Sequence, residues 1–396
     1  MPQTPHPLLV LLTLVAASAP TPAHAGGVVS ACDEAHLLDA LTSGGTVTFS
    51  CSGTIILTAT ITIAADTTID GSGQSVTISG DHAVRVFTVN SWVTLNLDRL
   101  TIADGIIIGS GGGILNNGTL IVSHGTFTGN SAQYTIDGGA GGGIDNSGTL
   151  TMSNSTFHGN GASTFGGGIY NHSGMVTISD SVFSSNGATN TGGGIYNKLG
   201  AVSVSNSTFS DNTGGGIVNY QGTVAISNST LTGNRAIAGG GMANGGTSTV
   251  SNSTFTGNSV GGGETGGSIA NYDSGGAATT LKNTIVANSP AGGNCFGTIT
   301  DGGGNLSYPD TTCPGINSDP KLGPLQNNLG PTLTMALLPG SAAIDTADDA
   351  ICAAAPVNGL DQRGITRPQG PHCDIGAYEA TLLPILPRAY LPLIMR

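Results

Sequence analysis

Charged side chains are scarce in this sequence. Only 8% of its 396 residues are charged, against roughly a quarter in ordinary globular domains. Acidic residues outnumber basic ones, so the formal net charge is −13. Proteins that bind nucleic acid or anionic membrane surfaces carry an excess of Lys and Arg. The composition therefore argues against both partners.

Long apolar segments are also missing. The N-terminal apolar run from Leu8 to Ala17 is too short to span a bilayer. It is followed by Ala23-His24-Ala25, a small-x-small motif typical of a cleavage site. We therefore expect a signal peptide at residues 1–25 and a mature chain without a transmembrane segment. The protein is expected to be secreted, and either extracellular or associated with the cell surface.

The positive feature that dominates the sequence is a repeated phrase. Gly-Gly-(Gly/Ser)-(Ile/Met)-x-Asn occurs seven times between Gly111 and Asn271. A fixed period in the twenties indicates one structural unit stacked on copies of itself. The successive closing asparagines are 30, 25, 26, 22, 25 and 27 residues apart: Asn116, Asn146, Asn171, Asn197, Asn219, Asn244 and Asn271.

The residues between these phrases indicate what kind of unit is stacked. Apolar residues alternate with Ser and Thr, as at Leu150 and Met152, which is the period of a β-strand. The repeats lack the i, i+3, i+4, i+7 spacing of amphipathic helices and have too few leucines for a leucine-rich repeat. We predict an all-β, right-handed parallel β-helix, a single-stranded solenoid with about three short strands per coil.

Stacking places equivalent residues directly above one another. We expect the closing asparagines to form a hydrogen-bonded ladder and the triple glycines to supply positive φ angles at sharp turns. An interior aromatic column is expected from one residue per coil, with Leu231 replacing it once: Phe127, Phe157, Phe183, Phe209 and Phe255.

Two sets of motifs resemble known families. Phe127-Thr-Gly-Asn130 and its equivalents, together with the glycine phrase, resemble the repeats of polymorphic outer membrane proteins and the wider pectin-lyase-like β-helices. Three later motifs resemble a choice-of-anchor module: Leu338-Pro-Gly-Ser-Ala-Ala-Ile-Asp345, Asp361-Gln-Arg-Gly364 and Cys373-Asp-Ile-Gly-Ala-Tyr-Glu379. The resemblance implies a secreted β-helix followed by an anchor-associated segment, and it implies no reaction.

The remaining segments complete the expected organisation. Residues 31–45 read as one short amphipathic helix, so residues 26–45 are predicted to cap the first coil. The β-helix is assigned to residues 46–315 and the choice-of-anchor-like module to residues 316–380. Residues 381–396 form an apolar, proline-containing tail, for which we favour a sorting or anchoring role over packing on the last coil.

Six cysteines in an exported chain favour disulfides over metal binding, because no Cys-x-x-Cys motif occurs. Fifteen connectivities are formally open. Proximity in the sequence favours Cys32 with Cys51, Cys295 with Cys313, and Cys352 with Cys373. Each pair lies near an end of the repeat region, where the exposed last strand of a solenoid needs protection.

We find no recognisable catalytic set. The adjacent acids Asp348 and Asp349 are expected in a solvated loop. His124 and Asp180 fall in a column that is otherwise asparagine, two coils apart, which is too far for a direct hydrogen bond. No phosphate- or dinucleotide-binding fingerprint occurs, so no cofactor and no metal are expected.

Two functions remain open. The leading hypothesis is a non-enzymatic surface protein for adhesion or envelope structure. The alternative is a carbohydrate-binding or carbohydrate-active β-helix of the polysaccharide lyase or hydrolase kind. Tyr170, Tyr196 and Tyr220 fall near equivalent turns and would stack on sugars, although covering the turns is the simpler explanation. Polysaccharide or other cell-surface components are the expected partners.

Overall fold

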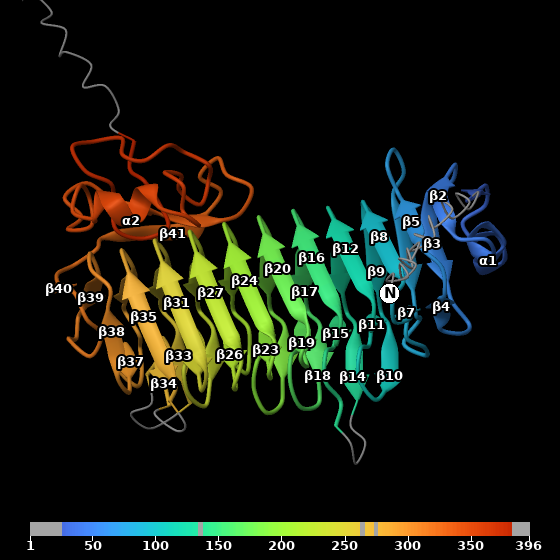
Figure 1. Cartoon of the computed structure of the whole chain (residues 1–396), viewed down its shortest axis with the longest axis horizontal. Coiled ribbons are helices and arrows are strands. Elements are labelled where there is room, and N and C mark those ends of the chain that lie inside the picture. Colours follow the sequence, from blue (N-terminus) through green and yellow to red (C-terminus); the bar gives the residue numbers. More distant parts are fainter. Residues whose placement is uncertain (1–25, 134–137, 262–265, 273–275, 382–396) are drawn as a thin grey trace, which may run out of the picture.

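The structure is a computed structural model that describes residues 26–133, 138–261, 266–272 and 276–381. Parallel strands stack into an elongated solenoid with the N-terminal helix at one end (Figure 1). The predicted parallel β-helix is therefore confirmed. The predicted signal peptide and residues 382–396 of the predicted tail lie outside the described residues.

Three long sheets, named here A, B and C, form the walls of the solenoid. Sheet A contains β1 (Val28–Val29), β2 (Gly45–Phe49), β5 (Thr67–Asp70), β8 (Thr94–Asp98), β12 (Thr119–Ser123), β16 (Thr149–Ser153), β20 (Met175–Ser179), β24 (Ala201–Ser205), β27 (Thr223–Ser227), β31 (Thr247–Ser251), β35 (Ala278–Lys282) and β38 (Ile299–Asp301). Sheet B contains β3 (Gly53–Ile56), β6 (Val76–Ser79), β9 (Leu100–Ala103), β13 (Thr126–Thr128), β17 (Thr156–His158), β21 (Val182–Ser184), β25 (Thr208–Ser210), β28 (Thr230–Thr232), β32 (Thr254–Thr256), β36 (Ile285–Ala287), β39 (Leu306–Tyr308) and β40 (Ile316–Asn317).

Sheet C contains the strands formed by the repeated phrase, and shorter strands lie between it and sheet B. It contains β4 (Ile61–Ile63), β7 (Phe87–Val89), β11 (Ile114–Asn116), β15 (Ile144–Asn146), β19 (Ile169–Asn171), β23 (Ile195–Asn197), β26 (Ile217–Asn219), β30 (Met242–Asn244), β34 (Ile269–Asn271) and β37 (Cys295–Phe296). Between sheets B and C, several coils add a fourth short strand: β10 (Ile106–Ile108), β14 (Ser131–Gln133), β18 (Gly161–Ala162), β22 (Gly187–Ala188), β29 (Arg235–Ala236) and β33 (Ser259–Val260).

The interior is filled by stacked apolar columns. Phe127, Phe157, Phe183 and Phe209 are fully buried, and their ring centroids lie 4.4, 4.8 and 4.6 Å apart along the stack. Leu231 and Phe255 continue the column in the register predicted from the sequence. Because each ring contacts the coils on either side, burial of this column ties neighbouring coils together.

The predicted asparagine ladder runs along the corner between sheets C and A. Each side-chain amide donates to the amide oxygen of the next coil, at 2.7 Å from Asn116 to Asn146 and at 2.8 Å from Asn244 to Asn271. A second ladder follows sheet B, where the amide of Asn160 also donates to the carbonyl of Phe127 in the preceding coil. Its members are Asn130, Asn160, Asn186, Asn212, Asn234 and Asn258. Both ladders satisfy buried amides that would otherwise destabilise the core.

The glycines of the phrase have two different roles. The first glycine adopts a positive φ, for example +77° at Gly192, as predicted for a sharp turn. The next two are needed for close approach, because a Cβ on Gly193 or Gly194 would collide with a backbone carbonyl of the following coil. The repeat therefore keeps glycine where coils touch backbone to backbone.

The column that contains His124 and Asp180 is a left-handed corner between sheets A and B. The φ angles of His124, Asn154 and Asp180 are +52°, +49° and +50°. Asn, Asp and His tolerate this conformation better than other non-glycine residues. The mixture of residue types is therefore a backbone requirement, and His124 contacts Asp98 at 3.1 Å.

A helix closes the first coil. Helix α1 (Glu34–Leu41) is shorter than the predicted 31–45, because Asp33 caps its N-terminus and β2 already begins at Gly45. Its Leu37 and Ala40 are buried against the solenoid. A disulfide between Cys32 and Cys51 joins this cap to the first coil.

The C-terminal segment packs on the outer face of sheet B (Figure 1). It contains the antiparallel pair β41 (Leu322–Gln326) and β42 (Thr334–Leu337) and helix α2 (Asp349–Ala353). Asp348 and Asp349 are both exposed, as expected of solvated acids, but Asp348 caps α2 and Asp349 lies in its first turn and not in a loop. The other two disulfides join Cys295 to Cys313 and Cys352 to Cys373, which matches the predicted pairing.

One buried glutamine holds this segment to the solenoid. Gln362 accepts a hydrogen bond from the Thr230 hydroxyl at 2.7 Å and donates to Thr208 Oγ1 at 3.0 Å. Thr208 in turn donates to the carbonyl of Leu333. The Asp361-Gln-Arg-Gly364 motif thus has a packing role in this chain. Neither described helix is long and apolar enough to cross a bilayer.

Candidate ligand-binding groove

The variable position of the repeated phrase lies on the outer face of sheet C. Because side chains alternate along a strand, the Ile or Met of each phrase points inward and the next residue points outward. In successive coils from β11 to β34 the outward residue is Leu115, Asp145, Tyr170, Tyr196, Val218, Ala243 and Ala270. The residue at this single position differs from coil to coil, so the outer surface of sheet C changes while the fold stays the same.

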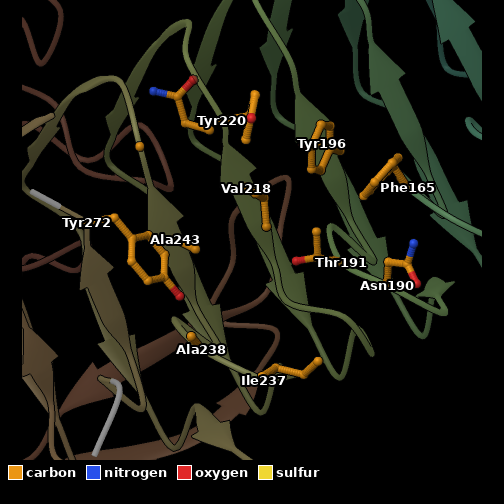
Figure 2. A pocket seen from close by; sticks show the side chains of 12 residues that line it. Phe165, Asn190, Thr191, Tyr196, Val218, Tyr220, Ile237, Ala238, Ala243 and Tyr272 are labelled. Carbon is orange, nitrogen blue, oxygen red and sulfur yellow. The ribbon is translucent and has the colours of Figure 1, made fainter. Parts of the chain in front are cut away.

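A step in side-chain size along this row creates a groove. Tyr170 and Tyr196 stack with ring centroids 5.7 Å apart, and Phe165 covers Tyr196 at 4.6 Å. Val218 and Ala243 follow, and they leave the space that a tyrosine would fill. Phe165 and Tyr196 form the end wall of the groove, and Val218 and Ala243 form its floor (Figure 2).

A short coil opens the groove on one side. The asparagines of β19 and β23 are 26 residues apart, whereas those of β23 and β26 are only 22 apart. The four missing residues correspond to Ala188–Thr191, because Thr213 pairs with Gly187 and leads directly into the next glycine phrase. The neighbouring coils keep their loops, so Thr191 and Ile237 line the two sides of the gap (Figure 2).

The opposite wall is the corner next to the asparagine ladder. Tyr220, Gly245 and Tyr272 occupy equivalent places in three successive coils. Tyr220 is 51% exposed and Tyr272 37% exposed, whereas Tyr196 is only 6% exposed. The resulting cavity has a volume of about 500 Å³, within the range of small-molecule sites.

The groove is aromatic and uncharged. Asn190 and Thr191 supply polar groups to its lining, whereas the side-chain amide of Asn219 is held in the asparagine ladder. No described residue of the lining is acidic or basic. Burial raises the pKa of Tyr196 to about 12, so its hydroxyl stays neutral at any physiological pH. Such a lining presents ring faces and neutral hydrogen-bonding groups to a ligand.

The family comparison agrees with this architecture. Residues 113–288 match the family model described as a right handed beta helix region. The chain folds as a right-handed parallel β-helix. Among solved structures, the β-helix is similar to the "Crystal structure of pectate lyase Pel9A", with 16% sequence identity, a TM-score of 0.46, and coverage of 86% of this chain and 90% of that chain. No curated protein matches this chain in sequence.

The structure separates the three tyrosines singled out in the sequence. Tyr170 and Tyr196 lie in strands of sheet C and are buried, so they do not cover turns as expected. Tyr220 lies one residue beyond β26 and stacks on Tyr196 at 6.4 Å. Tyr272 belongs with Tyr220 but was not singled out, although it also directly follows a closing asparagine.

A buried carboxyl of the β-helix also escaped the sequence analysis. Asp145 is 7% exposed, and its Oδ1 has no hydrogen-bond partner in the described part of the chain. Burial raises its pKa to about 7, against the opposing effects of a side-chain hydrogen bond with Ser110 and the charge of Arg85. Arg85 itself donates to the carbonyls of Ser110 and Gly111. The sequence feature that could have identified Asp145 is the presence of an acidic residue at the variable position of the repeated phrase.

The remaining sequence candidates lie away from the groove. Cys32, Cys51, Cys295, Cys313, Cys352 and Cys373 are all in disulfides near the two ends and in the C-terminal segment. His124 and Asp180 stand at the corner between sheets A and B. Within the described ranges, no group of three or more His, Cys, Asp or Glu side chains is arranged to hold a metal ion.

Proposed function

We propose that this chain is an exported, non-enzymatic β-helix surface protein that binds carbohydrate through the groove on sheet C. The observation that carries the proposal is the groove itself, where exposed Tyr220 and Tyr272 flank a floor of small side chains. An aromatic face packs well against the C–H face of a sugar ring. The neutral amide of Asn190 and the hydroxyl of Thr191 suit sugar hydroxyls as partners.

The chemistry of the lining favours binding over cleavage. Glycoside hydrolysis needs two carboxyl groups that flank the bond, and β-elimination needs a base beside the sugar. The described lining residues supply neither. Asp145 is one coil beyond Tyr170 and is buried. A lyase or hydrolase is therefore the second candidate, with adhesion or envelope structure served by binding alone as the first.

The C-terminal segment supports a surface location. Residues 316–380 carry the choice-of-anchor-like motifs, and three disulfides suit an oxidising compartment. The segment docks on sheet B and the groove lies on sheet C. An attached molecule would therefore keep the groove accessible.

Binding and cleavage are separated by one experiment on purified Gly26–Arg396. The protein is incubated with insoluble and soluble plant and microbial polysaccharides, and both retention on the polymer and release of new sugar ends are followed. We expect retention without new ends. New ends above a heat-treated control would establish the enzymatic alternative, and absence of both signals would contradict carbohydrate binding.

Removal of one aromatic wall should weaken this retention. Because Tyr220 is half exposed, Tyr220→Ala should change the stability of the β-helix little. It should lower affinity by about ten-fold or more, since an aromatic contact contributes on the order of 1 kcal/mol beyond its buried area. Leu199→Ala is the matched control, because Leu199 is exposed on the same corner but does not line the groove. Equal losses in both variants would contradict the assignment.

Filling the gap left by the short coil should also weaken polysaccharide retention, because it closes the groove. Insertion of Ala-Thr-Asn-Thr after Thr213 restores the loop that the preceding coil carries at Ala188–Thr191. Long surface insertions are tolerated thermodynamically, so we expect an unchanged unfolding temperature and loss of polysaccharide retention. Undiminished retention by the folded variant would show that the ligand binds elsewhere.

A further inference from the structure

The aromatic wall of the groove has a defined spacing. The backbone N–H of Tyr220 bonds to Asn197, that of Gly245 to Asn219 and that of Tyr272 to Asn244, so these residues lie in register in successive coils. Two parallel strand spacings separate the Tyr220 and Tyr272 backbones, about 10 Å. Gly245 leaves the coil between them without a side chain. The wall therefore alternates ring, gap and ring along the solenoid axis.

This spacing suits one kind of glycan chain. In an extended β-(1,4)-linked chain, neighbouring sugars are turned over relative to each other, so every second sugar presents the same face. The advance over two such sugars is comparable with two coils of the solenoid. An α-(1,4)-linked glucan chain curves and cannot keep sugar faces in register with a straight wall. The groove floor of Val218 and Ala243 is also straight, because both residues belong to one row of sheet C.

The absence of charge in the described lining further restricts the class of glycan that the groove can bind. No acidic or basic residue is present in the described lining, and the whole chain carries a net charge of −13. A polyuronate chain would lose hydration on entering without gaining a cationic partner in the lining. The basic residues next to the lining in the sequence are Lys198, which precedes Tyr220 in the corner column, and Arg235, which lies two residues before Ile237. Both stand outside the lining.

From the ring spacing and the neutral lining, and building on the carbohydrate-binding function above, we propose that the groove takes a neutral, extended β-(1,4)-linked glycan laid along the solenoid axis. Tyr220 and Tyr272 stack on alternate sugars, and Tyr196 closes one end. The ligand therefore has a minimum length, because a disaccharide cannot reach both rings.

Calorimetric titration of Gly26–Arg396 tests the proposal, with cellobiose, cellotetraose, xylotetraose, maltotetraose and tetragalacturonate as probes. We expect the affinity for cellotetraose or xylotetraose to exceed that for cellobiose by at least about ten-fold, the equivalent of one stacking contact. Tyr272→Ala should remove this gain, so that cellotetraose binds the variant no more tightly than cellobiose does. Lys198→Gln with Arg235→Gln should leave tetrasaccharide affinity within about two-fold, since neither charge touches a neutral ligand.

The outcomes separate this inference from the proposed function. Preference for maltotetraose or tetragalacturonate, with loss of binding in Tyr220→Ala, would overturn the β-linked neutral ligand while leaving carbohydrate binding intact. Affinity independent of chain length would also overturn it. If none of these probes binds and no polysaccharide retains the protein, both proposals fail. Circular dichroism melting of every variant ensures that a loss of binding is read only from folded protein.

Discussion

Asp145→Asn is expected to raise the stability of the β-helix by a few kcal/mol at pH 8 and to leave it nearly unchanged at pH 4. Burial raises the pKa of Asp145 from 3.8 to about 7, so the folded protein holds this proton more tightly than the unfolded chain. Each unit of pKa difference corresponds to about 1.4 kcal/mol. The free-energy cost of ionising the buried carboxyl is absent below pH 3.8, grows as the pH rises, and reaches its full value above about pH 7. An asparagine does not ionise and avoids it.

Chemical denaturation of the two proteins between pH 4 and pH 8 measures this difference. Arg85 keeps its hydrogen bonds to the carbonyls of Ser110 and Gly111 in the variant, so no new buried charge is left without a partner. Asp180→Asn is the matched control, because asparagine fills the same left-handed corner in other coils. If Asp145→Asn is less stable than the wild type at pH 8, the carboxylate is ionised and stabilised by Arg85.

The parts of the fold that repeat could be predicted from the sequence. The phenylalanine column and the closing asparagine ladder follow from period and residue type alone, because every coil offers the same contacts to the next. Asn130 and its equivalents were noted only as part of a motif, and their ladder required knowing that they face inward. The limits of α1 were also missed, because Asp33 caps the N-terminus of the helix, which therefore begins at Glu34.

The candidate groove could not be predicted because it arises where the repeat fails. Its floor depends on Val218 and Ala243 replacing a tyrosine, and its opening on a coil four residues shorter than the one before it. Both irregularities are visible in the sequence. Their meaning depends on knowing that the variable position of the phrase points outward and that the missing residues belong to the loop beside it.

The position of the C-terminal segment likewise could not be predicted from the sequence. Its motifs indicated a separate module, yet Gln362 and Ala377 form hydrogen bonds with sheet B, and Thr332 forms one with the corner between sheets A and B. Pairings between residues more than 100 positions apart leave no local pattern. The segment therefore has to be treated as packed on the solenoid when its stability is considered.

Arg367→Met should destabilise this C-terminal segment by about 3–5 kcal/mol, the usual effect of removing one partner from a buried ion pair. The Arg367 side chain has no exposed surface, donates to the carbonyls of Asp374 and Gly376 at 2.7 Å each, and lies 3.4 Å from Glu379. Its loss leaves the Glu379 carboxylate buried. Hydrogen exchange of the backbone amides of Asp374 and Gln369, which both donate to Glu379, reports the local opening.

The same pair predicts a pH dependence and a rescue. Burial already raises the pKa of Glu379 to about 6 despite the opposing charge of Arg367. Without the arginine the carboxyl takes up a proton more readily, so its pKa is higher in Arg367→Met than in the wild type. The loss should therefore shrink as the pH falls from 8 towards about 6. Adding Glu379→Gln removes the unpaired charge and should restore part of the lost stability at pH 8, although its single amide oxygen can accept only one of the two backbone hydrogen bonds. A double variant as unstable as the single one at pH 8 would mean that the hydrogen bonds of Arg367 to Asp374 and Gly376, and not its charge, hold the segment together.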